Sequence, residues 1–122
     1  SVVMDEEHLA AALRYVSLNP VRARLVARAE DWRWSSVRAH LHGRDDGLTT
    51  RGPVSERFAP FRSFLAEPSD PRALERLRAA ESIGRPLGDR AFLERLEGLS
   101  GRTLQPAKRG PKPSRPAAGR VD

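Results

Sequence analysis

Residues 5–26 are DEEHLAAALRYVSLNPVRARLV, and this stretch predicts two helices that meet at a proline. Asp5 is a good N-cap, and the two glutamates after it favour the positive end of a helix dipole. Apolar residues then recur at helical spacing, which predicts a first helix from about Asp5 to Leu18. Because proline disfavours helical angles in the residue before it, we expect Asn19 to leave that helix and Pro20 to begin a second one.

The sequence after this stretch predicts further short helices and no strand, since no segment alternates with a period of two. Helix starts are marked by the Ser-Ser pair before VRAH, by Asp70 and by Asp89, and Gly43 marks a helix end. Phenylalanines around Pro60 form an apolar stripe typical of a core helix, and the last two helices are expected to pair as a hairpin. We therefore expect a mainly α chain of about five to six short helices, followed by a disordered basic tail at residues 105–122.

Basic residues are concentrated at the C-terminal end of the chain. Residues 1–101 carry 16 Arg against 15 Asp or Glu, whereas residues 102–122 carry six Lys or Arg against Asp122. A flexible cationic tail attracts polyanions by releasing condensed counterions, so DNA is the first candidate partner. A membrane surface is the weaker candidate, because the tail lacks the apolar residues that anchor a segment in lipid.

The amino-acid composition also indicates the cellular compartment of the protein. The chain contains no cysteine, so no disulfide or thiolate metal site can form. No apolar run approaches the roughly 20 residues that span a bilayer, and the first residues lack the layout of a signal peptide. We expect a cytoplasmic protein without a membrane segment. The opening SVVMDEEHL places an apolar triplet directly before a helix start. We therefore expect this chain to be a piece of a larger domain.

Tyr15 is the single tyrosine of the chain, and two interpretations of it are open. On a helical wheel it lies at the edge of an apolar stripe that includes Leu13 and Val16, which favours a half-buried ring closing a core. A phenol is a weak nucleophile unless a metal, a base or a cation stabilises its anion. Helical spacing alone therefore favours packing over catalysis.

A compound pattern changes that preference: a tyrosine with Asn-Pro four and five residues later, then VRARLV, then DWRWSS. The segment DEEHLAAALRYVSLNPVRARLVARAEDWRWSSVRAHLHG resembles the C-terminal half of the catalytic domain of REP-associated tyrosine transposases, relatives of the IS200-like single-tyrosine transposases of mobile elements. ESIGRPLGDRAFLERLEGLSGRTL is similar to the C-terminal extension of many members. The resemblance implies part of an α+β ferredoxin-like catalytic domain at residues 1–52, a helical extension at 53–104 and a basic tail at 105–122.

The resemblance also implies a mechanism of DNA transposition and recombination. Tyr15 occupies the position of a nucleophile that attacks a phosphate of single-stranded or hairpin DNA, forms a 5′-phosphotyrosine and frees a 3′-hydroxyl. Members use Mg²⁺ or Mn²⁺, held by a His-hydrophobic-His pair on a strand upstream of the tyrosine, and that strand is not in this sequence. His40-Leu41-His42 has the same pattern but follows the tyrosine at a helix end, where the two rings diverge by about 200°. We therefore expect no metal site in this chain and no cleavage by the chain alone.

Further residues are candidates for DNA contact. Arg22 and Arg24 are suited to pairing with phosphates, with a solvated helix face as the alternative. Trp34 is suited to stacking on an unpaired base, with core packing as the alternative. We expect Asn19 and Pro20 to fix how the tyrosine is aimed.

The tail motif KRGPKPSRP resembles a loosened Arg-Gly-Arg-Pro element, which lies in A·T minor grooves, and Pro111 replaces its second arginine. We expect Arg109, Lys112 and Arg115 to tether the chain non-specifically to DNA of the nucleoid; a merely solubilising tail is the alternative. For the whole chain, the alternatives to a transposase are a non-catalytic helical DNA-binding module and a truncated transposase remnant.

Overall fold

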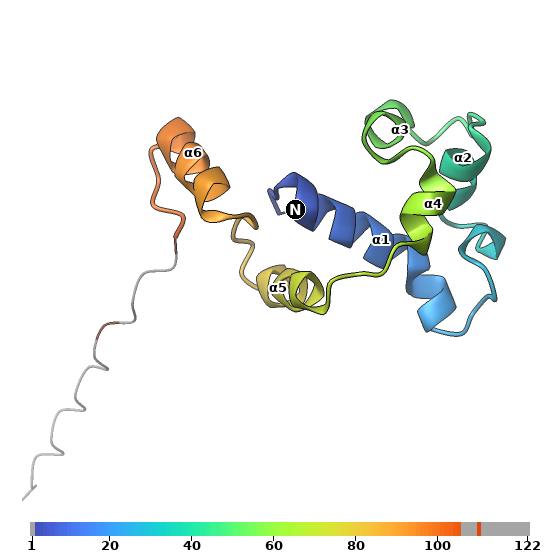
Figure 1. Ribbon diagram of the computed structural model, residues 1–122, viewed down its shortest axis with the longest axis horizontal. Coiled ribbons are helices and arrows are strands. Elements are labelled where there is room, and N and C mark those ends of the chain that lie inside the picture. Colours follow the sequence, from blue (N-terminus) through green and yellow to red (C-terminus); the bar gives the residue numbers. More distant parts are fainter. Residues whose placement is uncertain (1, 106–109, 111–122) are drawn as a thin grey trace, which may run out of the picture.

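The computed structural model describes residues 2–105 and residue 110, and within this part the chain is mainly helical, as the sequence predicted (Figure 1). The two β-type hydrogen bonds of its isolated bridge, Met4 with Leu87, tie the segment before the first helix to the segment before the last. The ferredoxin-like origin of the fold stays a prediction. The helical elements are α1 (Glu6–Arg22), η1 (Ala29–Asp31), α2 (Val37–His42), α3 (Gly52–Phe58), α4 (Phe61–Ala66), α5 (Pro71–Glu81) and α6 (Arg90–Ser100).

The longest helix, α1, lies between two groups of elements (Figure 1). η1 and α4 pack on one part of α1, and α5 packs on another. On the α4 side, Val37, Phe61 and Phe64 are buried in one cluster, and Leu13 and Leu18 of α1 pack against it. Burying a phenylalanine stabilises a fold by up to about 3 kcal/mol, so this cluster is the main apolar anchor of α1.

α1 and α5 pack on each other, and small side chains are buried on both helices. Ala11 of α1 is buried, and so are Ala73 and Ala80 of α5. Alanines leave short ridges on a helix surface, which allows two helix backbones to approach closely. The close approach brings long side chains of α5 next to α1, which matters for Tyr15 below.

Aspartates begin three helices, as predicted. Asp5, Asp70 and Asp89 each accept a hydrogen bond from a backbone N–H in the first turn of α1, α5 and α6. Asp5 Oδ2 also accepts from the backbone N–H of Asp89 at 2.9 Å, so the starts of α1 and α6 are tied together. Burial raises the pKa of Asp5, but hydrogen bonds from His8 and Asp89 outweigh that effect and hold its pKa below the ordinary value.

The expected break at Asn19 and the second helix beginning at Pro20 are both wrong. α1 continues through Pro20 to Arg22 and is capped by Ala23, and the next residue, Arg24, is left-handed with φ 57°. A proline inside a helix removes one backbone hydrogen bond, and here the lost bond belongs to the last turn of α1. The N–H groups of Ala23 and Leu25, just after the helix, donate to the carbonyls of Asn19 and Pro20 and close this end. Packing of Val21 on the core cluster favours the continued helix.

The apolar stripe expected for the first helix is buried only in part, because Leu13 packs on the core cluster but Val16 does not. Val16 is 63% exposed, whereas the polar residues His8, Arg14 and Ser17 are buried. The wheel assumed one buried side, but α1 is packed from two directions, and among the described residues no element covers Val16.

Two other expectations about helices need correction. The phenylalanine stripe lies on two helices, α3 and α4, because Pro60 lacks an amide hydrogen and disfavours a helical Ala59. The predicted hairpin of the last two helices does not form, since α6 lies apart from α5 (Figure 1). α6 has no fully buried residue, and its Leu99 is 85% exposed.

Candidate nucleic-acid interface

Tyr15 lies in the second half of α1 with its ring half-buried. The guanidinium carbon of Arg22 is 4.0 Å from the centre of the ring, and that of Arg78, from α5, is 5.5 Å away. Cations at such distances are attracted by the negative face of an aromatic ring. We call Tyr15, Arg22 and Arg78 the tyrosine cluster.

Arg22 is held in this position by its own helix. Its Nη2 donates to the backbone carbonyl of Tyr15 at 2.7 Å and to Oδ1 of Asn19 at 2.6 Å. The side chain of Asn19 therefore orients Arg22 instead of capping a second helix. The predicted role of Asn19 and Pro20 in aiming the tyrosine stays a prediction, but Asn19 does aim the arginine beside it.

The tyrosine cluster is suited to an anion. The hydroxyl of Tyr15 makes no hydrogen bond to any described residue, and Arg78 makes no hydrogen bond or ion pair within the same part of the chain. A guanidinium matches the geometry of a phosphate and can approach two of its oxygens. The ring of Tyr15 thus has two guanidinium groups beside it, from two different helices, that are suited to a nearby phosphate.

Arg24 is exposed and lies just beyond the end of α1. Its N–H donates to the carbonyl of Val21 at 3.0 Å, and the N–H of Leu25 donates to the carbonyl of Pro20 at 2.9 Å. These bonds form a Schellman motif, in which glycine is the usual left-handed residue. Here a charged side chain takes that position and extends from the same end of α1 as Arg22.

The two tryptophans differ in burial. Trp34 is 74% exposed, whereas Trp32 is half-buried. The guanidinium carbon of Arg33 lies 4.6 Å from the centre of the Trp34 ring. Ser35 Oγ accepts a hydrogen bond from the N–H of Val37 at 3.1 Å, so the first serine of the pair supports the start of α2. Trp34 is thus available for stacking and does not belong to the core.

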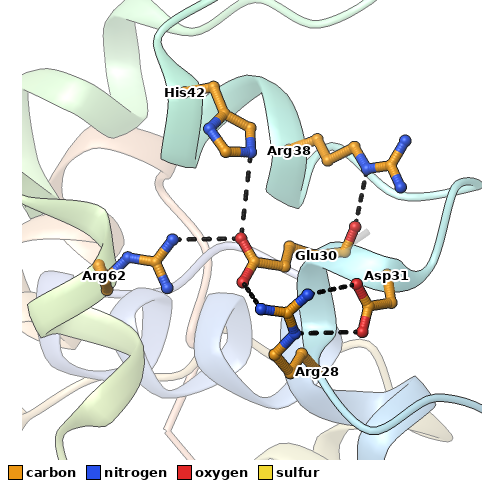
Figure 2. A network of polar contacts seen from close by, with 6 residues as sticks. All are labelled: Arg28, Glu30, Asp31, Arg38, His42 and Arg62. Carbon is orange, nitrogen blue, oxygen red and sulfur yellow. Dashed lines mark hydrogen bonds and ion pairs between the residues drawn. The ribbon is translucent and has the colours of Figure 1, made fainter.

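A network of charges around Glu30 joins η1 to α2 and α4 (Figure 2). Glu30 Oε2 accepts from Arg62 at 3.1 Å and faces Nε2 of His42 at 4.0 Å, while Oε1 is 3.4 Å from Arg28. The hydrogen bond from Arg62 and the neighbouring positive charges lower the pKa of Glu30. The Glu30 backbone carbonyl accepts from Nε of Arg38 at 2.8 Å. The sequence pattern did not predict this network, which also includes Arg62, 32 residues beyond Glu30 along the chain.

The His-hydrophobic-His sequence of α2 does not form a metal site. His40 packs on Phe61, with ring centres 5.1 Å apart, whereas His42 faces Glu30 (Figure 2). Burial and, secondarily, the charge of Arg51 lower the pKa of His40. Within the described residues no group of three or more His, Cys, Asp or Glu side chains is placed to hold a metal ion. The described residues therefore do not fit the Mg²⁺ or Mn²⁺ that the sequence resemblance implies.

Arg78 and Arg33 were not among the candidates named from the sequence. Each belongs to an arginine-rich segment in which no spacing marks one arginine over another. Arg78 is distinguished only by the packing of α5 on α1, and Arg33 only by the exposure of its neighbour Trp34. The tail candidates Arg109, Lys112 and Arg115 lie outside the described residues.

No family model, curated protein or solved structure matches this chain. The transposase family therefore stays a prediction from sequence motifs. Across the helices the structure describes, none is long and apolar enough to cross a membrane.

Proposed function

We propose that this chain is the tyrosine-bearing part of a single-tyrosine DNA transposase of the REP-associated type, acting in the cytoplasm on single-stranded or hairpin DNA. The observation that supports the proposal is the tyrosine cluster. The tyrosine that the sequence motif marks as the nucleophile has two guanidinium groups at its ring, supplied by α1 and α5.

In the proposed step the phenol oxygen of Tyr15 attacks a DNA phosphorus and forms a new P–O bond. The bond from phosphorus to the 3′ oxygen breaks, the phenol proton passes to solvent or a base, and the leaving 3′ oxygen takes up a proton. The 5′ end remains on the tyrosine, and attack by a 3′-hydroxyl reverses the step without ATP. Arg22 and Arg78 stabilise the charge that develops on the phosphate oxygens.

The remaining candidates hold the strand. Arg24 contacts a phosphate beyond the end of α1, and Arg109, Lys112 and Arg115 add non-specific attraction to the DNA backbone. A divalent cation would polarise the scissile phosphate, but the described residues do not fit one, so no step of this proposal runs through a metal. The proposal requires the metal-holding histidines from a segment outside these 122 residues.

The test is covalent capture of labelled hairpin DNA in the presence of Mn²⁺. The full chain is assayed with and without a supplied upstream segment that carries the His-hydrophobic-His pair, and adducts are separated on a denaturing gel. Tyr15→Phe should abolish the adduct while leaving binding of the hairpin largely intact. Removal of a charge donor from such a site typically slows the chemistry about 10²- to 10³-fold, so Arg22→Met and Arg78→Met should slow adduct formation strongly.

Arg95→Met is the matched control, because Arg95 is an exposed arginine of α6 that makes no hydrogen bond or ion pair to a described residue. An adduct that persists in Tyr15→Phe would refute the assignment of the nucleophile. Equal rates for Arg78→Met and Arg95→Met would refute the role of the second guanidinium.

The alternative is a helical DNA-binding module without catalysis. It is favoured by one observation, that no described residue lies within hydrogen-bond distance of the Tyr15 hydroxyl to act as its base. This alternative predicts hairpin binding that is equal in wild type and Tyr15→Phe and no adduct under any condition, including the assay with the supplied upstream segment.

A further inference from the structure

A cationic cavity lies between α2, the segment before it and the turn after it. Its volume is about 540 Å³, and six of the residues that line it are Arg33, Ser35, Arg38, Arg44, Asp45 and Asp46. Binding sites for small molecules commonly have volumes of about 300 to 1,000 Å³, so this space is large enough for one nucleotide unit. We call it the arginine cavity.

The two aspartates of the cavity are engaged by their own turn. Asp45 Oδ1 accepts from the N–H of Gly47 at 3.0 Å. Asp46 accepts from the N–H groups of Leu48 and Thr49 at 2.9 and 2.7 Å, and from the Thr49 hydroxyl at 2.7 Å. Neither aspartate forms an ion pair with the three described arginines of the cavity, and the lining holds three arginines against two aspartates.

The arginines of the cavity, in contrast, keep donors for a ligand. Arg38 uses its Nε on the carbonyl of Glu30, and Figure 2 shows its two terminal nitrogens directed away from that bond. Arg33 and Arg44 make no hydrogen bond or ion pair to any residue in the described range. His42 is turned toward Glu30. The cavity therefore presents guanidinium donors that form no ion pair with the two carboxylates of its own lining.

An aromatic platform adjoins these donors. Arg33 lines the cavity and also lies over the ring of Trp34, which is 74% exposed. A simple anion would account for the arginines but would leave most of the indole exposed, since Arg33 is the one described cation over its ring. A nucleotide has both a phosphate and a flat aromatic base, and bases stack on exposed indole rings in single-strand binding proteins. Duplex DNA is a poor match, because its bases are already stacked on each other.

We propose that the arginine cavity binds one nucleotide unit of a single-stranded nucleic acid, with its phosphate among the arginines and its base stacked on Trp34. This inference deepens the proposed function and rests on it, because it takes the bound strand to be the DNA substrate of the transposase. It adds a second contact point, on α2, that holds the strand at a distance from the tyrosine cluster.

The test is binding of a fluorescein-labelled ten-nucleotide oligothymidine by the full chain, measured by anisotropy over a series of salt concentrations. Stacking on an aromatic residue contributes about 1–3 kcal/mol per base, so Trp34→Ala should weaken binding roughly five- to 150-fold. Arg44→Ala should weaken binding and make the logarithmic salt slope shallower by about 0.7, as expected for the loss of one phosphate contact to a single strand. Arg95→Ala is the charge-matched control and should bind as the wild type does.

A second readout follows the indole itself. In Trp32→Phe the remaining tryptophan is Trp34, and its emission should fall when unlabelled oligothymidine binds. Inorganic phosphate is the competing probe: if phosphate displaces the oligonucleotide from wild type and from Trp34→Ala with equal effect, the cavity holds an anion alone and the nucleotide assignment is wrong. Wild-type affinity in Trp34→Ala, or equal affinities of Arg44→Ala and Arg95→Ala, would also overturn it.

The outcome is separable from that of the capture assay. Loss of oligothymidine binding in Trp34→Ala, with no adduct at Tyr15 under any condition, would support the cavity and refute the transposase chemistry. An adduct formed at the wild-type rate by Trp34→Ala, with undiminished oligothymidine affinity, would support the chemistry and refute the cavity.

Discussion

Replacement of the buried Arg14 should destabilise the fold more than replacement of any arginine on its surface. Arg14 is 7% exposed, and its Nε donates to the backbone carbonyl of Phe64 at 2.9 Å. In a longer helix that carbonyl would accept from the residue four positions on, which is Pro68 and has no N–H. Arg14 of α1 therefore supplies the missing donor at the end of α4, and its Nη2 pairs with Glu67 at 3.0 Å.

The magnitude follows from the three contacts of this guanidinium. A charged hydrogen bond to a buried carbonyl contributes about 1.5–3 kcal/mol. The pair with Glu67 contributes about 0.2–1 kcal/mol, because the Glu67 side chain is 66% exposed. The guanidinium carbon also lies 4.4 Å from the centre of the Phe64 ring, which adds about 0.5–1 kcal/mol. Relief of guanidinium desolvation offsets part of this sum, so we expect Arg14→Met to lower the free energy of unfolding by about 2–3 kcal/mol.

The assay is urea unfolding of the full chain followed by far-ultraviolet circular dichroism. Methionine keeps an apolar stem of similar length, so the loss reports the polar contacts and not a cavity. Glu67→Gln should cost no more than about 1 kcal/mol, and Arg95→Met should remain within about 0.5 kcal/mol of wild type. A stability of Arg14→Met equal to that of Arg95→Met would refute the inference that Arg14 completes α4.

Two further predictions concern the turns that follow α1 and α2. Arg24→Gly should raise the free energy of unfolding by about 1 kcal/mol, because φ at this position is 57° and a left-handed conformation costs other residues about 1–2 kcal/mol; a destabilised variant in urea unfolding would contradict the Schellman motif. The Thr49 hydroxyl, with the Thr49 and Leu48 amides, lowers the pKa of Asp46 from 3.8 to about 2. A carboxylate whose pKa is lowered by folding contributes stability that is complete above the pKa of the unfolded chain and is lost as the pH falls through about 2. Asp46→Asn should therefore lose less stability than wild type between pH 4 and pH 2. Parallel pH profiles of the two proteins in thermal unfolding would contradict this prediction.

The correct predictions from sequence were those with a local physical cause. Asp5, Asp70 and Asp89 begin helices because a short carboxylate reaches an amide two or three residues later, whatever the rest of the chain does. Gly43 ends α2 with φ 61°, a conformation that glycine adopts without a steric cost. Such signals needed no knowledge of which helices pack together.

The incorrect predictions were those in which packing outweighed a local preference. The Asn-Pro sequence favours a break, yet α1 continues because Pro20 is buried and Leu18 and Val21 pack on the core. The apolar pattern marked Val16 as a core residue, yet two neighbouring sets of elements bury a different and more polar face of α1. Arg14 was missed for the same reason, since its partners lie 50 and 53 residues away.

The packing of the helices also bears on whether Tyr15 is a core residue. A tyrosine that closes an apolar core would be expected among the side chains around Phe61 and Phe64, but of the described residues that pack on that cluster Tyr15 is not one. Its ring contacts guanidinium groups instead, and one of them comes from α5, which the resemblance assigns to the C-terminal extension and not to the catalytic domain. Because α5 packs on α1, the position of Arg78 beside Tyr15 depends on the fold of the extension. The surroundings of the tyrosine are therefore incomplete without residues 71–81, and the extension cannot be treated as a separate appendage of the tyrosine-bearing segment.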